Sequence, residues 1–573
     1  MKKFLLGVLI GFLFSGLALV IFFFAMLRLG STPPEIPDGS MLTLKIEGPV
    51  PESPSVEVPL PVFERLSPPT VRDYWELLRK AAADRRIRAV VLMPEGVDAG
   101  WGKLQELRAD LLEFKKSGKP IYAILRAPGT REYYLATAAD RIYMAPEDYL
   151  DLKGLRAELT YFKNTLDKLG VRVEVEHAGK YKDAPEAFTR DSMSPETREV
   201  MNSILDDLFG QLTGAIATAR KKTPEQIRAT IDEGPFVSGQ ALAAGLVDSL
   251  RYQDQVFGEL QRALKLPAIR KVSYRDYLKV PPESAGVETG RHVAFVVAEG
   301  DILRGENGVF ASQGGINPAD MTSMLRRVGN DRGIRGVIVR IDSPGGDAFA
   351  SDEIWREMAE LGKKKPLVIS MSDTAASGGY DMAMTGDPLV AYPATFTGSI
   401  GVFYGKVDLR GLYEKLGIRK DIISRGQFAE IDSDYGPLSD AARKKLQREI
   451  DAFYSRFVSR VAEGRRKTVA QIEPVAQGRV WLGSQAKANG LVDELGGIDR
   501  AIELLKQKAG IPLSEQVKLV AFPPQRTIWD QLFGQSEAAS ANAPLMAFLK
   551  RFAARTWFQG GMLKVMPYSI EVK

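Results

Sequence analysis

The sequence predicts an α/β protein that contains two copies of one domain. Short runs rich in β-branched residues alternate with amphipathic stretches, an order typical of parallel βαβ units. Motifs of the first half recur in the second half in a steady register, which indicates an internal duplication. The 573 residues, 45% of them hydrophobic and 26% charged, are ordinary globular composition and suffice for several domains.

The N-terminus predicts a membrane anchor, residues 1–28. Lys2 and Lys3 precede an uncharged apolar run, residues 4–27, which Arg28 closes. A helix needs about 20 apolar residues to cross a bilayer, and the run lacks the small-residue exit of a cleaved signal peptide. Because basic flanks stay cytoplasmic, we expect a single-pass protein of a bacterial inner membrane with its bulk on the periplasmic side.

A buried core helix is the alternative interpretation of this run. The next segment, residues 29–40, is a Pro-rich tether, which disfavours an immediate turn into a core. The chain is then expected to fall into three further parts: a first repeat at 41–285, a second repeat at 290–512 and a C-terminal extension at 513–573.

Recurring motifs define the two repeats. Residues 87–90 (IRAV) recur as 334–337 (IRGV), and residues 245–248 (GLVD) recur identically as 490–493. Chance matches of short apolar runs do not keep such a register. In the second repeat the pattern predicts strands at 337–339 and 366–370 and helices at 351–361 and 440–462. In the extension, residues 545–557 predict a short amphipathic helix docked on the parent domain.

The composition excludes several kinds of site. The chain has no cysteine, so disulfides, thiolate metal sites and a cysteine nucleophile are ruled out. Its two histidines, His177 and His292, are too few for a His-rich metal site. A net charge of +5 on this length does not indicate a nucleic-acid binder. We therefore expect no metal, no cofactor and no nucleic-acid partner.

Chemistry is expected where the two repeats differ. The second repeat carries Pro344-Gly345-Gly346 directly after a strand, and such a turn exposes backbone N–H groups that can hold an oxyanion. Ser377 stands before Gly378-Gly379, among small residues that let a peptide approach its hydroxyl. The first repeat has Thr130-Arg131-Glu132 at the serine's position. Each glycine pair alone is commonly a tight turn, but together they indicate a nucleophile with an oxyanion pocket.

A serine nucleophile needs a base, and no histidine follows Ser377. A lysine acts as a base only when burial or a lack of counter-charges destabilises its ammonium form. The first repeat contains Lys180 and Lys182, whereas the second has Ala429 at the position of Lys182. This reciprocal loss predicts one site built from both repeats. From the residues alone, a solvated surface lysine remains the commoner role, and Lys180 remains an alternative.

Four segments resemble a known family. They are residues 342–346 (DSPGG), 376–380 (ASGGY), 397–401 (TGSIG) and 179–182 (GKYK). The chain resembles the signal peptide peptidase A family in its long, duplicated form, which comprises Ser-Lys proteases. The resemblance covers the chain from the anchor to about residue 512 and implies two tandem ClpP/crotonase-like domains after the N-terminal transmembrane helix.

The resemblance also implies the roles of individual residues. Ser377 is implied as the nucleophile, Lys182 rather than Lys180 as the general base, and Ser399 as the residue that orients the lysine. The implied oxyanion donors are Gly345 and Gly346, with Gly378 a further candidate.

The function implied is that of a membrane-anchored serine endopeptidase that degrades remnant signal peptides. The family further implies a homo-oligomer, a tetramer whose sites face an inner cavity. Phe403 and Tyr404 are candidate walls for apolar peptides, although ordinary core packing explains them equally well.

Two residues depart from the family pattern. Asp342 stands where the resemblance leads us to expect asparagine, and we expect it to face away from the oxyanion pocket and to cap the next helix. Asp183 follows Lys182 directly and would raise the pKa of the lysine, unless its carboxylate points to solvent.

Two other classes of function remain open at this stage. One is a crotonase-type enzyme that acts on acyl-CoA with the oxyanion pocket and without a nucleophile. The other is a membrane-anchored binding scaffold with an inactive site, which an exposed Lys182 far from Ser377 would favour.

Overall fold

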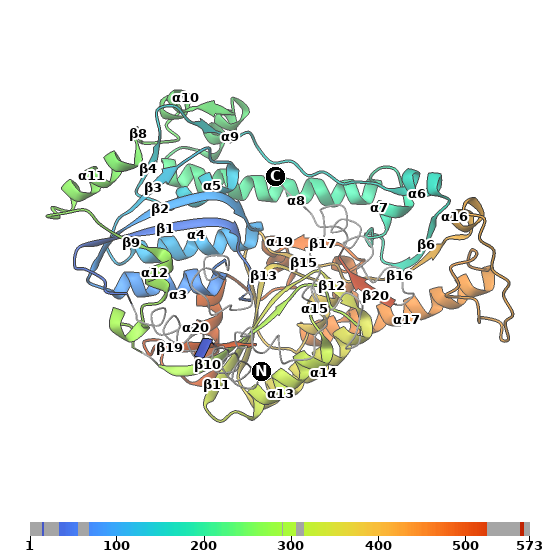
Figure 1. Ribbon diagram of the computed structural model, residues 1–573. Coiled ribbons are helices and arrows are strands. Elements are labelled where there is room, and N and C mark those ends of the chain that lie inside the picture. The colour runs from blue at the N-terminus through green and yellow to red at the C-terminus, as the bar shows by residue number, and fades with distance from the viewer. Residues whose placement is uncertain are drawn as a thin grey trace, which may run out of the picture.

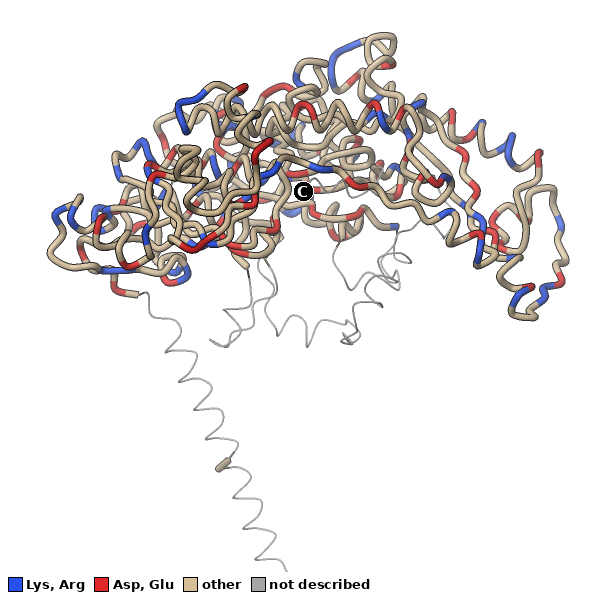
Figure 2. Tube along the Cα trace, turned by 90° about the horizontal axis from the view of Figure 1, so that it is seen from above, with Lys and Arg blue, Asp and Glu red and all other residues tan. Residues whose placement is uncertain are grey.

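Two large parallel sheets, each flanked by helices, form the body of the molecule (Figure 1). The computed structural model describes residues 14–15, 34–54, 68–288, 290–304, 315–523 and 562–566. In the view of Figure 2, Lys and Arg residues are interspersed with Asp and Glu residues along the described parts of the trace.

The first sheet has six strands in the order β8-β4-β3-β2-β1-β9, all parallel. Its central strands are buried on both faces, which is why they are almost continuously apolar. The strands are β1 Ser40–Pro49, β2 Ile87–Asp98, β3 Ile121–Leu125, β4 Arg141–Met144, β8 Ser249–Leu250 and β9 Arg270–Ser273. A separate pair joins β5 Tyr149–Leu150 to β7 Phe236–Val237.

The second sheet repeats this order. Its parallel path is β19-β10-β11-β13-β14-β18, and β15 and β17 extend from β13. The identical strand order confirms the predicted duplication. The strands are β10 Arg291–Glu299, β11 Ile334–Ser343, β13 Leu367–Ala376, β14 Leu389–Ala391, β15 Phe396–Gly398, β17 Val480–Leu482, β18 Glu494–Leu495 and β19 Val517–Phe522.

The helices begin where the sequence offers caps. In α3, Val71–Ala83, Thr70 and Asp73 form a capping box, and Asp347 caps α14, Ala348–Lys364, by accepting from two backbone N–H groups. The helices predicted at 351–361 and 440–462 are confirmed as α14 and α17, Asp440–Gly464. The long helix α8, Pro195–Arg220, is the counterpart of α17 in the first repeat.

The remaining helices are shorter. In the first repeat they are α4 Trp101–Lys115, α5 Thr130–Ala136, α6 Lys163–Leu169, α7 Glu186–Thr189, α9 Pro224–Asp232, α10 Ser238–Ala243, α11 Gln253–Ala263, α12 Tyr274–Leu278 and the 3-10 turn η1 Pro282–Ala285. In the second they are α13 Pro318–Asn330, α15 Gly378–Met382, α16 Arg410–Lys415, α18 Val469–Ile472, η3 Glu473–Val475, α19 Gly483–Asn489 and α20 Ile498–Ala509.

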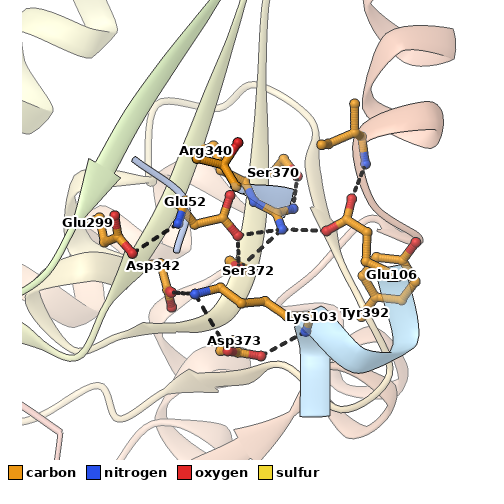
Figure 3. A network of polar contacts seen from close by, with 12 residues as sticks. Glu52, Lys103, Glu106, Glu299, Arg340, Asp342, Ser370, Ser372, Asp373 and Tyr392 are labelled. Atoms are coloured by element: carbon orange, nitrogen blue, oxygen red, sulfur yellow. Dashed lines mark hydrogen bonds and ion pairs between the residues drawn. The ribbon is translucent and has the colours of Figure 1, made fainter. Parts of the chain in front are cut away.

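The two repeats share a buried ionic network (Figure 3). Arg340 of β11 is fully buried and pairs with Glu106 of α4 and, at 2.9 Å, with Glu52. Burial alone would lower the pKa of Arg340, but the two carboxylates raise it above its ordinary value. Asp373 of β13 caps α4 from the other repeat, since it accepts from the backbone N–H groups of Gly100 and Lys103. The repeats are therefore joined by interactions that neither can satisfy alone.

A small four-stranded sheet, ordered β12-β20-β16-β6, positions the site. Its first-repeat strand β6, Arg172–Ala178, pairs antiparallel with the second-repeat strand β16, Val402–Asp408, along its whole length. The other two strands are β12, Gly345–Asp347, and β20, Met562–Val565. This sheet brings the segment after β6 into the second repeat.

Several predicted segments are placed differently or lie outside the described residues. Strand β19 belongs to the second sheet, so that sheet continues beyond residue 512 into the predicted extension. The helix predicted at 545–557 lies outside the described residues, as does all of the predicted anchor except Phe14 and Ser15. Across the described ranges, no helix is both long and apolar enough to span a membrane.

Candidate active site

Ser377 occupies a strained turn between β13 and α15. Its φ of 52° and ψ of −111° are unusual for a residue with a side chain. The turn is held because its backbone N–H donates to the carbonyl of Gly398 at 2.8 Å. The side chain is fully buried. This backbone fixes the hydroxyl at the end of a central strand.

Lys182 reaches Ser377 from the other repeat. Its chain leaves β6 through Gly179, whose φ of 109° suits glycine. The Nζ atom donates to Ser377 Oγ at 2.9 Å, to Ser399 Oγ at 2.9 Å and to the Ser399 carbonyl at 3.2 Å. Lys182 is 1% exposed, whereas Lys180 is exposed. The structure thus brings together the three side chains that the resemblance singled out, and it leaves Lys180 outside.

Two glycines make room for the lysine. A Cβ atom on Gly401 would lie 3.0 Å from Lys182 Cδ, and one on Gly478 would lie 2.6 Å from the Lys182 backbone nitrogen. Both distances are shorter than ordinary carbon contacts, so larger residues would displace the lysine. Gly401 lies in the TGSIG motif. Gly478 carried no signal in the sequence, because its role arises from a loop that packs on the first repeat.

Burial tunes the lysine toward its neutral form. The pKa of Lys182 is lowered to about 7, chiefly because burial removes the amine from water; the charge of Asp183 opposes this shift, and the positive charge of Lys564 contributes to it. A lysine with this pKa is largely neutral at slightly alkaline pH. It can then accept a proton from the serine hydroxyl beside it.

Asp183 does not point to solvent, so the predicted rise in the pKa of Lys182 applies. Asp183 is buried, and its carboxylate accepts a hydrogen bond from Thr197 Oγ1 at 2.6 Å. The hydroxyl of Ser194 donates in turn to Thr197 Oγ1 at 2.9 Å. The carboxylate is therefore held by the start of α8, but its charge still raises the pKa of Lys182.

Asp342 does not cap the next helix, because Asp347 performs that role. Instead, Asp342 pairs with Lys103 of the first repeat at 2.7 Å (Figure 3). It also accepts from the backbone N–H of Thr374 at 3.0 Å. Its charge is thus compensated within the interface of the repeats. This partner could not be predicted from the local sequence, since Lys103 belongs to the other half of the chain.

Three glycine backbones converge next to Ser377. Gly345 has a φ of 102°, and a Cβ atom there would overlap the carbonyl oxygen of Lys564 and lie 2.6 Å from the Gly378 nitrogen. A Cβ atom on Gly378 would lie 3.1 Å from both the Gly346 nitrogen and the Lys564 oxygen. The N–H of Gly345 donates to Ser343 Oγ at 3.2 Å. Because Ser343 holds the N–H of Gly345, the N–H groups of Gly346 and Gly378 are the candidate donors to a carbonyl oxygen placed as that of Lys564.

Strand β20 lies across the site as an extended peptide would. It pairs antiparallel with β12 on one side, with Gly346 opposite Lys564, and with β16 on the other, with Phe403 opposite Leu563. Phe403 and Tyr404 are buried, and both line this strand. The two candidate wall residues are thus part of the core and also neighbours of β20. Such strand addition is a common way of holding an extended peptide.

The geometry therefore meets the requirements of a serine nucleophile with a lysine base. A hydroxyl, a buried amine and glycine backbones that can offer N–H groups lie within one compact region. In the part of the chain that the structure describes, no group of three or more His, Cys, Asp or Glu side chains is placed to hold a metal ion.

Comparison with known proteins finds a protease family whose model matches both repeats. The model of "Peptidase family S49" matches residues 113–267 and 359–512, one match in each repeat. The chain is 36% identical to "Serine protease SPPA, chloroplastic" of Arabidopsis thaliana over 87% of this chain and 73% of that protein. It is 34% identical to "Protease 4" of Salmonella typhi over 78% of this chain and 74% of that protein.

Among solved structures, "ClpP1 from Listeria monocytogenes" aligns with 36% of this chain and 91% of its own at 16% identity and a TM-score of 0.22. The fold and the matches define the class of protein, which is an α/β serine protease. More particularly, the chain belongs to peptidase family S49 and carries two of the family's domains.

Proposed function

We propose that this protein is a membrane-anchored endopeptidase in which Ser377 and Lys182 form the catalytic dyad and remnant signal peptides are the substrates. The observation that carries the dyad is the 2.9 Å hydrogen bond between Lys182 Nζ and Ser377 Oγ in a buried pocket. The lowered pKa of Lys182 supports the same assignment, because a base must be neutral to accept a proton.

The proposed reaction proceeds in two steps. Neutral Lys182 takes the proton of Ser377 as the oxygen attacks a peptide carbonyl, while the hydrogen bonds to Ser399 hold the amine in place. Backbone N–H groups of Gly346 and Gly378, beside Gly345, stabilise the oxyanion. The protonated lysine then protonates the leaving amine, and a water molecule, deprotonated by Lys182, hydrolyses the acyl-serine ester.

Extended peptides are the proposed form of substrate. The groove between β12 and β16 already accommodates one extended strand, β20, which supports recognition through backbone pairing. The apolar run at residues 4–27 supports an anchor in the inner membrane with the repeats on the periplasmic side. An anchored site would meet peptides that remain in the same bilayer.

A homotetramer is proposed from the family resemblance. It is tested by light scattering on the full chain in detergent, where a mass of four chains plus bound detergent is expected.

Alkaline extraction and protease accessibility of membrane vesicles test the anchor. Release of the protein by alkaline carbonate would refute a transmembrane segment.

The dyad is tested by labelling with a fluorophosphonate probe and by cleavage of a fluorogenic peptide. We expect the wild type to be labelled and Ser377→Ala to lose both labelling and cleavage. Lys182→Ala should lose nearly all turnover, because the serine then lacks its base. Lys180→Ala is the matched control, since Lys180 is a neighbouring but exposed lysine and should retain activity.

Either of two results would refute the dyad. Undiminished labelling of Ser377→Ala would show that another residue is the nucleophile. Equal activity losses in Lys180→Ala and Lys182→Ala would remove the special role of Lys182. The inactive scaffold has no support from the geometry, because Lys182 is buried against Ser377 rather than exposed and distant.

A further inference from the structure

We propose that the pocket around Asp381 selects a lysine or arginine side chain on the residue whose carbonyl is attacked. This proposal rests on the proposed function and names the substrate class of that same site. It arises from strand β20, which lies in the groove and shows where the side chains of a bound peptide go.

The backbone of β20 identifies the relevant position. Lys564 is the register partner of Gly346, and its carbonyl oxygen lies against Gly345 and Gly378. Gly378 and the register partner Gly346 are the proposed oxyanion donors, and Gly345 stands beside them. The carbonyl of a residue placed as Lys564 is therefore the one that Ser377 would attack, and its side chain occupies the pocket that determines specificity.

The side chain of Lys564 is buried in a charged pocket. It is 4% exposed, and its Nζ atom pairs with Asp381 Oδ2 and lies 4.6 Å from the centre of the Phe457 ring. A carboxylate and an aromatic face are the two partners that stabilise a desolvated ammonium or guanidinium group. An apolar side chain in this position would leave the carboxylate poorly compensated.

The carboxylate of Asp381 can accept hydrogen bonds from a cationic side chain of the substrate. It is fully buried on α15, four residues after Ser377, and its Oδ1 atom has no hydrogen-bond partner among the described residues. Its other fixed partner is Arg460, at 3.0 Å, which also pairs with Asp352. Arg460 is shared between two carboxylates, so its single positive charge cannot neutralise both. A second cation beside Asp381 restores electrical neutrality there.

The flanking residues of β20 predict the rest of the preferred peptide. Leu563 and Val565 point to the opposite side and pack in the apolar cluster that contains Phe403. The favoured peptide is therefore a basic residue with apolar residues on both sides. In a signal peptide, a basic residue meets an apolar run where the positively charged start adjoins the apolar core, with the apolar residues on its C-terminal side.

The first test uses the wild-type full chain and peptides that differ only at the attacked position. We expect kcat/KM for lysine and arginine to exceed that for norleucine, an uncharged side chain of similar length, by about tenfold or more, since a charge-assisted contact is lost. Glutamate should be the poorest residue. Equal or faster cleavage of the norleucine peptide would overturn the proposal.

The second test changes the pocket. Asp381→Asn should lower the lysine-to-norleucine ratio of kcat/KM by about tenfold, and Asp381→Glu should restore part of it. Asp352→Asn is the matched control, because it removes the other carboxylate of Arg460 without touching Lys564. An unchanged ratio in Asp381→Asn, or the same loss in Asp352→Asn, would overturn the proposal.

A binding measurement separates this proposal from the proposed function. In Ser377→Ala, which lacks the nucleophile, a fluorescein-labelled lysine peptide should bind about tenfold more tightly than its norleucine counterpart. That preference without any cleavage by the wild type would refute the dyad and keep the pocket. Cleavage by the wild type without this binding preference would refute the pocket and keep the dyad.

Discussion

The Nζ atom of Lys182 and the Oγ atom of Ser377 lie 2.9 Å apart, although 195 positions separate the two residues and each belongs to a different repeat. The antiparallel pairing of β6 with β16 brings them together. Five measurable consequences follow from this pair and its surroundings.

The activity should rise with pH through about 7. Lys182 accepts a proton only when neutral, and the neutral fraction grows as pH rises through its pKa of about 7. Below that value kcat/KM should increase about tenfold per pH unit, and above it the profile should level off. The measurement is kcat/KM with a fluorogenic peptide from pH 5 to 10. A profile that still climbs at pH 10 would mean an ordinary lysine.

Asp183→Asn should move this rise to lower pH. The charge of Asp183 stabilises the ammonium form of Lys182 and so raises its pKa. Its removal favours the neutral amine, and the amide still accepts the hydrogen bond from Thr197. The same pH profile measures the shift, with the exposed Asp191→Asn as control. A shift to higher pH would contradict this account.

Gly401→Ala should lower kcat while the protein stays folded. The added methyl group would lie 3.0 Å from Lys182 Cδ, which pushes the amine away from Ser377. Misplacement of a catalytic group by about 1 Å costs on the order of a hundredfold in rate. Gly210→Ala in α8 is the control, because nothing lies within 4 Å of its added carbon. Equal kcat values in the two variants would refute the tight fit.

Lys564→Asp should favour added peptide substrates. It replaces the ion pair with Asp381 by a repulsion, so β20 competes less well for the groove. A tethered segment competes at an effective concentration of about millimolar, and its release should lower the apparent KM several-fold. Lys518→Asp makes the same charge change on an exposed position of β19. An unchanged KM in Lys564→Asp would show that β20 does not compete.

Arg340→Leu should destabilise the docked repeats. It leaves Glu52 and Glu106 buried without their cation, which typically costs about 3–5 kcal/mol. Chemical denaturation, followed by the midpoint of the first transition, measures the loss. Arg326→Leu breaks a half-exposed pair with Glu357 and should cost about 1 kcal/mol or less.

A rescue experiment accompanies the Arg340 prediction. Glu52→Gln and Glu106→Gln, added to Arg340→Leu, remove the uncompensated charges and should recover part of the lost stability. If the single variant unfolds like the wild type, the network contributes nothing to docking.

Much of the fold was predictable from local patterns. The repeat register, the α14 and α17 helices and the strand at 337–339 all depend on short-range periodicity, which the sequence displays directly. The strand predicted at 366–370 runs on to Ala376. Its continuation contains Asp373, whose carboxylate is satisfied by α4 of the other repeat. A partner in the other repeat cannot be predicted from the sequence pattern around Asp373.

The residues of the candidate site were likewise predictable only in part. Ser377 and Ser399 lie in glycine-rich motifs, and Lys182 was distinguished from Lys180 only by family resemblance. Asp381 and Lys564 were not predicted. They meet only because β20 pairs with β12 and β16, and no motif of the first repeat corresponds to β20. Long-range docking, rather than local propensity, decides these contacts.

The division of the proposed dyad between two halves has a consequence for biosynthesis. A ribosome completes the lysine half first, and the serine half can acquire its base only after both have been made and have docked. Until then the nascent polypeptide carries a hydroxyl of ordinary reactivity. Assembly of the mature architecture would therefore act as the switch that turns on hydrolysis.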